Sequence, residues 1–349
     1  FAGEYVYRHA RFRRYFGAPG DRLLARLFPP GHRPERVGVD EGGGQAARTI
    51  RLEVPTGLAC WAGHFPGRPM LPGVLQVDWV LRELEAWRGE RPQLVALEGL
   101  KFKHPVLPGD ALVLELVADD GVGFRFLRSG EIVSQGRVRL ARAGDASASG
   151  PVPGPASARA SGRASGPAES AGARAESGPM ANGPWPEPAA VLVHAAPMLW
   201  LRAIEGHDER ETRSLVAVSD LAGFADPAGG IGAHVALEWM AQTVAAHAGL
   251  VRRARGEAPA LGLLLGSKHV GFARPAYTRD ELFRVVAVRG WGGDQGAASF
   301  DCRVESLDGR ACVAKARLAC FLPGDDSGIG SESESESANE SAIERGSVG

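Results

Sequence analysis

The sequence predicts an α+β fold made of two similar domains, each with an antiparallel sheet wrapped around one central helix. Three observations support this prediction. In each half of the chain, a loop rich in glycine and proline leads into one long apolar helix. Each helix carries an acidic residue near its start, Asp78 in the first and Glu238 in the second. Each helix is followed by several short segments of strand character, an order typical of a sheet packed on a helix.

Composition limits the classes of function. The chain has 349 residues, of which 44% are hydrophobic, enough for two ordinary domains. Its formal net charge of −1 gives no electrostatic reason to expect a nucleic acid or a membrane surface as partner. No apolar run is long enough to span a membrane, and no signal peptide opens the chain. The four cysteines form no C-x-x-C pair, which favours free thiols in a reducing, cytoplasmic compartment.

Three stretches are expected to lie outside the two domains. Residues 1–46 are rich in arginine, with one helical spacing at 21–28, and are interpreted as a leader or the tail of an upstream domain. The chain opens with Phe1 rather than methionine, which favours a fragment of a longer protein. Residues 142–183 consist mainly of Ala, Ser, Gly, Pro and Arg and are expected to form a flexible linker. Residues 324–349 form an acidic Ser/Glu tail that is expected to be disordered.

The first domain is expected at 47–141. Alternating apolar and polar residues predict a strand at 49–54. From Val74 the apolar residues recur at helical spacing, which predicts a helix at 74–87 that ends at Gly89. Further strands are expected at 94–102, 111–117, 123–128 and 132–141.

The second domain is expected at 184–323 and repeats this order. Strands are expected at 201–204 and 212–218, before a second loop that contains glycine and proline. A mostly apolar helix is expected at 234–249. The strands that follow are expected at 261–266, 268–274, 282–289, 298–305 and 311–321.

The stretch 63–79 combines a rigid loop with two ionisable groups. It has the sequence G-H-F-P-G-R-P-M-L-P-G-V-L-Q-V-D-W. Proline fixes φ and glycine accepts backbone angles that other residues avoid, so the loop before the helix has a defined, non-repetitive shape. It places the imidazole of His64 just before a helix that carries the carboxylate of Asp78 among apolar residues. A buried carboxylate needs a partner or a chemical role.

This string resembles the signature of the β-hydroxyacyl thioester dehydratases of the hotdog fold, H-F-P-G-x-P-x-x-P-G-V-L followed by an acid fourteen residues after the histidine. Asp78 stands fourteen residues after His64. Residues 101–110, K-F-K-H-P-V-L-P-G-D, resemble the K-F-x-x-P-V-x-P-G-D turn of the same family. The resemblance implies a tandem hotdog packed as an intramolecular pseudo-dimer. Within the family, the first domain resembles the dehydratase type of aryl-polyene pathways.

The second domain resembles companion dehydratase-like hotdogs of the same pathways. The strings that carry this resemblance are L-E-W-M-A-Q, L-G-L-L-L-G and F-D-C-R-V. Glu238 stands at the acid position of the family's helix, with Gln242 one turn further along the same face. Two departures are informative. Phe224 stands fourteen residues before Glu238 where the family has histidine, and Ala233 replaces the glycine that opens the helix.

The resemblance implies an acid–base reaction on a thioester. In the family, the histidine of one protomer faces the acid of the other around a tunnel for the phosphopantetheine arm of the substrate. His64 would take the proton from C2, and a carboxyl whose pKa is raised by burial would protonate the leaving hydroxyl. The backbone N–H of Gly73 would polarise the thioester carbonyl, with Phe65 and Gln242 as further substrate contacts. The expected partner is an acyl carrier protein, with no metal and no cofactor beyond the arm on the substrate.

The sequence leaves the acid that completes the site open. His64 can face Glu238 in one site between the domains, in which case Asp78 faces Phe224 in a site without a base. Alternatively, first domains from two chains pair and bring His64 to Asp78. His234, at the start of the second helix, is either a substitute base or an ordinary N-terminal polar residue.

Two other functions stay open for the whole chain: a hotdog acyl thioesterase and a non-catalytic scaffold that binds acyl chains. His104, beside Pro105, is interpreted as a turn residue, and His194, His247 and His269 show no spacing with acids or cysteines that suggests a metal site.

Overall fold

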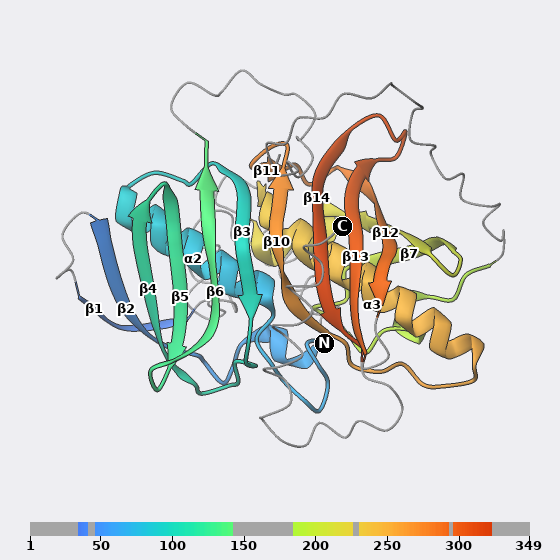
Figure 1. The fold of residues 1–349 in the computed structure, drawn as a ribbon, viewed down its shortest axis with the longest axis horizontal. Helices are drawn as coiled ribbons and strands as arrows, with labels where there is room; N and C mark the ends of the chain where they lie inside the picture. Colours follow the sequence, from blue (N-terminus) through green and yellow to red (C-terminus); the bar gives the residue numbers. More distant parts are fainter. Residues whose placement is uncertain (1–33, 41–45, 142–183, 226–229, 293–295, 323–349) are drawn as a thin grey trace, which may run out of the picture.

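The computed structural model describes residues 34–40, 46–141, 184–225, 230–292 and 296–322. The helix expected at 21–28, the linker at 142–183 and the tail at 324–349 all lie outside the described residues. The described residues form two units, and each unit contains one long helix and a set of antiparallel strands (Figure 1).

The first unit follows the predicted order closely. Helix α2 (Gly73–Arg88) begins after Pro72, and Gly89 ends it in the left-handed conformation, with φ 74°. Its sheet has the order β1-β2-β4-β5-β6-β3. The strands are β1 (Glu35–Asp40), β2 (Ala47–Glu53), β3 (Leu94–Phe102), β4 (Ala111–Asp119), β5 (Gly121–Arg128) and β6 (Glu131–Leu140).

Strand β1 corrects one predicted boundary. It lies inside the stretch 1–46 that the sequence assigned to a leader, yet it pairs antiparallel with β2, with Val39 opposite Ile50. The first sheet therefore begins before residue 47. The segment E-R-V-G-V-D has only two apolar residues, so its strand conformation depends on this pairing rather than on a pattern visible in the sequence.

The second unit repeats the arrangement. Helix α3 (Ala236–Ala254) follows the 3-10 turn η5 (Ala233–Val235), so the α-helix begins two residues later than predicted. The two strands predicted at 261–266 and 268–274 form one strand, β10 (Leu263–Phe272). The second half of the sheet consists of β7 (Leu201–His207), β8 (Glu211–Ala217), β10 (Leu263–Phe272), β12 (Leu282–Gly292), β13 (Ala297–Ser306) and β14 (Cys312–Phe321); two short segments, β9 (Ile231–Gly232) and β11 (Ala276–Tyr277), pair separately.

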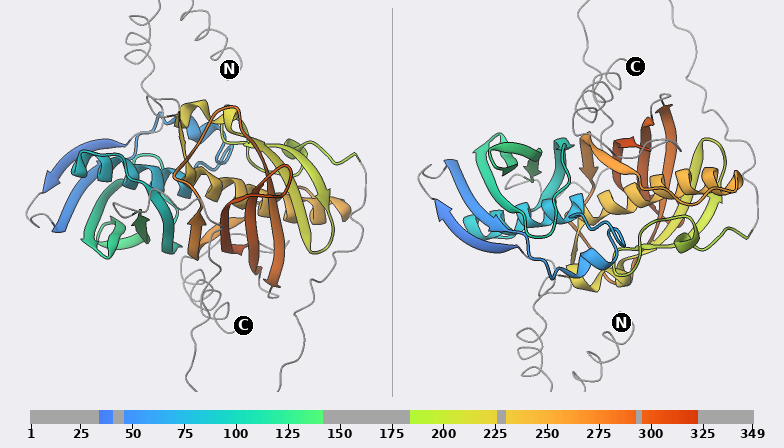
Figure 2. Two further views of the ribbon diagram at one scale, coloured as in Figure 1. Left: turned by 90° about the horizontal axis from the view of Figure 1, so that it is seen from above. Right: turned by 90° about the horizontal axis from the view of Figure 1, so that it is seen from below.

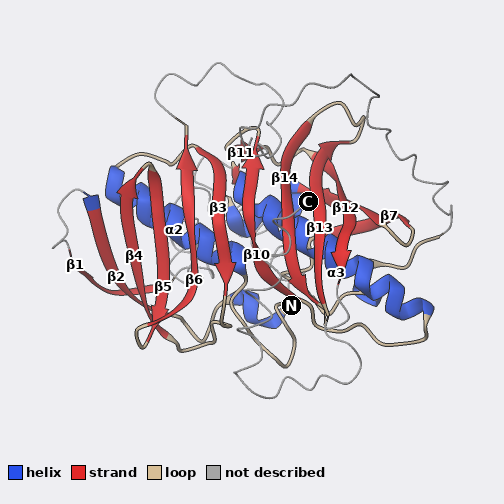
Figure 3. Ribbon diagram, in the orientation of Figure 1, coloured by secondary structure: helices blue, strands red, loops and turns tan. Residues whose placement is uncertain are grey.

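The two units share one continuous sheet. Strand β3 of the first pairs antiparallel with β10 of the second, with Leu100 opposite Ser267, which gives a twelve-stranded sheet that runs from β1 to β7. Both helices lie on the same side of this sheet, and the sheet curves around them (Figures 2 and 3). The seam between β3 and β10 therefore fixes the position of one domain relative to the other.

A buried tryptophan next to each acid fixes the rotation of each helix. Trp79 follows Asp78 and is fully buried, while Trp239 follows Glu238 and stacks on Tyr277 with ring centroids 5.5 Å apart. Consecutive residues of an α-helix point about 100° apart. Burying each tryptophan against its own sheet leaves the neighbouring acid to point in another direction, toward the other domain.

All four cysteines lie in the part of the chain that the structure describes, and all are free thiols. Burial raises the pKa of Cys60 and of Cys320 to about 12, so both stay protonated at neutral pH. Within the described residues, no helix combines the length and the apolar character that a membrane crossing requires.

The seam predicts a specific sensitivity at Gly266. A Cβ atom at this position would lie 2.0 Å from the carbonyl oxygen of Leu100, across the pairing of β3 and β10. Because backbone must move to admit it, Gly266→Ala is expected to lower the free energy of unfolding by about 3 kcal/mol. Urea denaturation followed by circular dichroism measures this change.

The matched control is Gly57→Ala, because a Cβ atom at Gly57 would meet nothing within 4 Å. This variant is expected to change the free energy of unfolding by less than about 1 kcal/mol. Equal stability of the two variants would show that the close approach at the seam does not constrain the fold.

Candidate active site

His64 lies in a loop whose backbone bonds hold it in place. The N–H of His64 donates to the carbonyl of Cys60 at 2.8 Å, and the N–H of Met70 donates back to the carbonyl of His64 at 3.0 Å. The N–H of Leu71 donates to the carbonyl of Val106 at 2.7 Å, which joins this loop to the turn at 101–110. The two strings that carried the family resemblance are therefore in contact in the structure.

A hydrogen bond sets the tautomer of His64. Its Nδ1 lies 2.8 Å from the carbonyl oxygen of Met70. A carbonyl oxygen can only accept, so Nδ1 carries the hydrogen and Nε2 keeps its lone pair. The ring of Phe65 lies against that of His64, with centroids 4.0 Å apart, and forms one wall of the site. His64 thus presents a basic nitrogen in a buried, partly aromatic environment.

Gly73 opens helix α2 and offers a free donor. The helix has no side-chain cap, and no described residue accepts a hydrogen bond from the N–H of Gly73. The first N–H groups of a helix lack partners within the helix and lie at the positive end of its dipole. A Cβ atom at Gly73 would lie 2.5 Å from the ring of Phe102, so a larger residue would displace the aromatic ring or the helix start.

Glu238 stands in the first turn of α3, and Gln242 holds its carboxyl group. The side-chain nitrogen of Gln242 donates to Oε1 of Glu238 at 2.8 Å and to the carbonyl of Met198 at 2.6 Å. The side-chain oxygen of Gln242 accepts from the N–H of Trp200 at 2.9 Å. The sequence predicted Gln242 as a substrate contact; the structure places its amide on Glu238 and on the segment 198–200.

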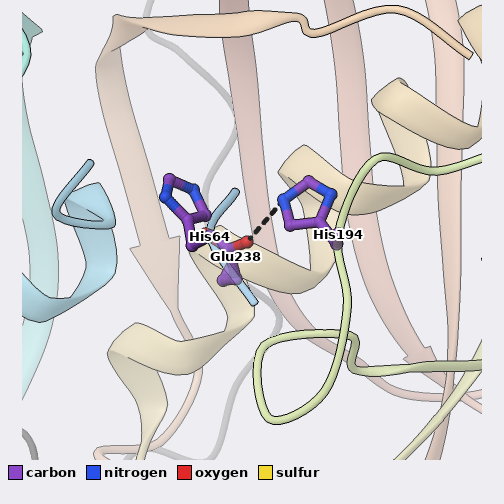
Figure 4. Close-up of side chains that lie close together, drawn as sticks. All are labelled: His64, His194 and Glu238. Carbon is purple, nitrogen blue, oxygen red and sulfur yellow. Dashed lines mark ion pairs between the residues drawn. The ribbon is translucent and has the colours of Figure 1, made fainter. Parts of the chain in front are cut away.

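The structure brings His64 and Glu238 together across the domain boundary and adds His194 to them. One ring nitrogen of each histidine and one carboxylate oxygen of Glu238 all lie within 4.8 Å of one another, and all three residues are buried. Nε2 of His194 lies 3.5 Å from Oε1 of Glu238 (Figure 4). Two imidazoles and a carboxylate are also groups that bind divalent cations in proteins.

A backbone bond between the domains joins the two histidine-bearing loops. The N–H of Ala195 donates to the carbonyl of Gly63 at 3.0 Å, next to His194 on one side and His64 on the other. A Cβ atom at Gly63 would lie 2.2 Å from the carbonyl oxygen of Ala195, so only glycine permits this approach. Sequence reasoning missed His194, because it stands 44 residues before Glu238 and shows no motif spacing to it. A lone histidine in the otherwise apolar run H-A-A-P-M-L-W was the one available signal.

Burial and neighbouring charge set the protonation of the pair. Burial lowers the pKa of His64 to about 4, against the opposing effect of the Glu238 charge, so the imidazole is neutral at neutral pH. Burial alone would raise the pKa of Glu238, but His194, His64 and Gln242 together lower it. The prediction of a carboxyl with a raised pKa is therefore wrong for this site without substrate. The polar neighbours that the sequence could not place outweigh desolvation.

Asp78 lies beside His234 and Arg82. Nε2 of His234 lies 3.4 Å from Oδ1 of Asp78, and Nε of Arg82 donates to Oδ2 at 2.6 Å. His234, from the turn before α3, thus reaches Asp78 from the other domain. The expectation that Asp78 faces Phe224 stays a prediction, because the side chain of Phe224 lies outside the described part of the chain. Burial raises the pKa of Asp78, but His234 and Arg82 outweigh it and lower the pKa.

The start of α3 also differs from the start of α2. The N–H of Ala233, which stands where the first domain has Gly73, donates to the carbonyl of Pro275 at 2.9 Å. It is therefore engaged, whereas the N–H of Gly73 is free. The region around Asp78 has an acid and a histidine but lacks the free helix-start donor at that position.

Two family models match the two domains. Residues 41–137 match the ApeI-like family of ApeI dehydratases, and residues 186–329 match the ApeP-like family of ApeP dehydratases. The chain is also similar to the 3-hydroxyacyl-[acyl-carrier-protein] dehydratase FabZ of Roseiflexus sp. (strain RS-1), at 33% identity over 112 residues that cover 28% of this chain and 77% of the relative.

FabZ of Fusobacterium nucleatum subsp. nucleatum is 42% identical over 62 residues, which cover 16% of this chain and 44% of that relative. The chain thus spans less than half of this relative, as it does of FabZ from Clostridium acetobutylicum, of which 43% is covered.

The dehydratase domain of RzxB from Pseudomonas fluorescens is a similar solved structure. It is 18% identical, with a TM-score of 0.52, and the match covers 85% of this chain and 99% of that one. At this identity the likeness shows the fold alone. It confirms the tandem hotdog that the sequence predicts, because one solved domain spans both units of this chain.

The buried, neutral state of His64 predicts a loss of stability at acid pH. An unfolded histidine takes up its proton near pH 6.5, whereas burial holds the pKa of His64 at about 4 in the folded protein. Between these values the unfolded state binds more protons, so the free energy of unfolding falls as the pH falls. The full difference corresponds to about 3 kcal/mol. Denaturant titrations between about pH 7 and about pH 4 measure it.

His64→Gln is the control, because glutamine does not titrate in this range. This variant is expected to lose less stability than the parent chain over the same pH interval. His247, whose pKa burial also lowers to about 4, is present in both proteins and cancels in the comparison. An identical pH dependence of the two proteins would contradict the neutral buried state of His64.

Proposed function

The chain belongs to the hotdog-fold 3-hydroxyacyl-[acyl-carrier-protein] dehydratases, and we propose that it removes water from a 3-hydroxyacyl thioester to give a trans-2-enoyl thioester. The observation that carries this proposal is the meeting of His64 and Glu238 across the domain boundary, within 4.8 Å. A base from one domain and an acid from the other thus face one substrate position. The proposal adds the free N–H of Gly73, at the start of α2, as the donor to the thioester oxygen.

His64 is the base in this proposal. Its Nε2 takes the proton from C2 of the acyl chain, because the bond from Nδ1 to Met70 leaves Nε2 unprotonated. Negative charge then develops on the thioester oxygen. The N–H of Gly73, at the positive end of α2, donates to this oxygen and stabilises the charge.

Glu238 is the acid. Because the pKa values of both groups are lowered in the site without substrate, the reactive form in this proposal is one that has taken up a single proton, held on the carboxyl of Glu238. Breaking the C2–H bond transfers a proton to His64, and breaking the C3–O bond takes the proton of Glu238 away with the hydroxyl as water. The double bond forms between C2 and C3. A proton then returns from His64 to Glu238 over the short distance between them.

We propose an acyl carrier protein as the partner that delivers the substrate on its phosphopantetheine arm. The names of the FabZ relatives support a carrier-bound substrate, and the pairing of an ApeI-like with an ApeP-like domain supports a role in fatty-acid or aryl-polyene-type synthesis. In this proposal the two domains, joined in one chain, form one dehydration site.

Substitutions at the two site residues and at Asp78 test the pairing. His64→Ala and Glu238→Gln are each expected to lower kcat by at least about 100-fold, because each removes one proton-transfer group. Asp78→Asn is expected to keep most of the turnover, since Asp78 is engaged by Arg82 and His234. The measurement is formation of enoyl product from a 3-hydroxyacyl carrier-protein substrate.

Full activity of Glu238→Gln would exclude the site between the domains. A loss in Asp78→Asn as large as that in His64→Ala, in a protein that remains folded, would favour pairing of first domains from two chains. Release of free thiol without enoyl product would show a thioesterase instead. Circular dichroism of each variant separates loss of function from loss of fold.

Turnover is expected to require no added metal and no cofactor beyond the arm of the substrate. The proposed steps use the lone pair on Nε2 of His64, the proton of Glu238 and a backbone N–H. Dialysis against excess EDTA should therefore leave kcat unchanged within about twofold. A loss of activity that Zn²⁺ or Mn²⁺ restores would show that a cation bound to the same three side chains takes part in the reaction.

A further inference from the structure

His194 is a buried histidine to which the proposed mechanism, with His64 as base and Glu238 as acid, assigns no role. It lies in the segment before β7, with 8% of its surface exposed. Its Nδ1 is buried and has no hydrogen-bond partner among the described residues. Its Nε2 points to the acid of the site, 3.5 Å from Oε1 of Glu238 (Figure 4). A buried polar ring held toward a single carboxylate calls for a functional explanation.

The contacts of Glu238 are unequal between its two oxygens. Oε1 accepts a hydrogen bond from Gln242 at 2.8 Å and is also the oxygen that His194 approaches. No described residue donates a hydrogen bond to Oε2. Two neighbours thus fix the carboxyl through one oxygen and leave the other to meet the substrate.

Asp78 provides an internal comparison. Its Oδ2 accepts a hydrogen bond from Arg82 at 2.6 Å, and its Oδ1 lies 3.4 Å from Nε2 of His234. Although burial raises the pKa of Asp78, His234 and the permanent positive charge of Arg82 lower it and favour the ionised form. The two acids of the pseudo-dimer therefore differ in the groups that hold them, a guanidinium for Asp78 and a neutral amide for Glu238.

The position of His194 depends on the loop that carries the base. The residue after it, Ala195, donates its N–H to the carbonyl of Gly63 at 3.0 Å, directly before His64. The ring of His194 also lies edge-on to Phe65, with centroids 4.7 Å apart, and 5.4 Å from the ring of His64. The contact between His194 and Glu238 is thereby tied to the placement of His64.

From this geometry we propose that His194 is a positioning residue: it holds Oε1 of Glu238, together with Gln242, so that Oε2 faces the C3 hydroxyl of the substrate. The inference rests on the proposed dehydratase function and extends it to a third side chain. A contact of 3.5 Å in the site without substrate is expected to shorten when the substrate binds. His194 acts through Glu238 and does not itself touch the reacting atoms.

The first test compares two substitutions at this position. His194→Leu removes the donor and is expected to lower kcat by about 10- to 100-fold, the range for a lost hydrogen bond to a charged group, with KM changed less than about twofold. His194→Gln places an amide N–H near the position of Nε2 and is expected to recover part of the loss. His247→Leu, which removes another buried histidine of the second domain, is expected to leave kcat unchanged within about twofold.

The second test measures the activity of the base separately from that of the acid. A saturated acyl thioester without the 3-hydroxyl can exchange its C2 hydrogen for deuterium through His64 and Gly73 alone, with no leaving group to protonate. His194→Leu is expected to keep this exchange within about twofold of the parent chain while it loses dehydration. His64→Ala is expected to lose both.

Each other pattern overturns the inference in a distinct way. Loss of exchange and dehydration together in a folded His194→Leu protein would mean that His194 supports the base or the loop and does not position the acid. Full dehydration by His194→Leu would mean that Gln242 alone positions Glu238. If the parent chain showed neither exchange nor dehydration, the proposed function itself would fail, and with it the role of His194.

Discussion

The pairing of β3 with β10 is the constraint on which the candidate site depends. It joins the two units into one sheet and sets how close the start of each helix comes to the other domain. The backbone bond from Ala195 to Gly63 then brings the loop of His64 against the segment of His194. The geometry of a site divided between two domains depends on how the domains pack. Gly63 and Gly266, which have no reactive side chain, contribute to it because each permits a close backbone approach between the domains.

The two halves of the pseudo-dimer have similar residues at the start of each helix, but these residues have different neighbours. Each helix carries an acid followed by a buried tryptophan, and each acid lies close to a histidine of the other domain, Glu238 to His64 and Asp78 to His234. Near Glu238, the neutral imidazole of His64 and one carboxyl oxygen stay available to a substrate, and the N–H of Gly73 at the start of α2 is free. Around Asp78, Oδ2 is held by the guanidinium of Arg82, and the N–H of Ala233 is bonded to the carbonyl of Pro275. The partners of each acid and of each helix start thus differ between the two regions.

The sequence by itself determined the fold class and most of the elements. The spacing of apolar residues and the Gly/Pro loops placed both central helices and nearly all strands, because these patterns report local geometry and one buried face. The family strings pointed to His64, Gly73 and Glu238 and made the meeting of His64 with Glu238 across the domains one of two possible arrangements. These features are readable because each lies within one short stretch of chain.

Only the tertiary structure decided what surrounds each charge. His194 reaches Glu238 and His234 reaches Asp78 across separations of 44 and 156 residues, where no spacing rule applies. For the same reason the expected rise in the pKa of Glu238 was wrong: burial can be inferred from an apolar helix, but the donors that offset it come from remote segments. The strand conformation of β1 likewise depends on its pairing with β2, which comes later in the chain. Local pattern fixes which face of an element is buried, while packing decides which polar groups meet there.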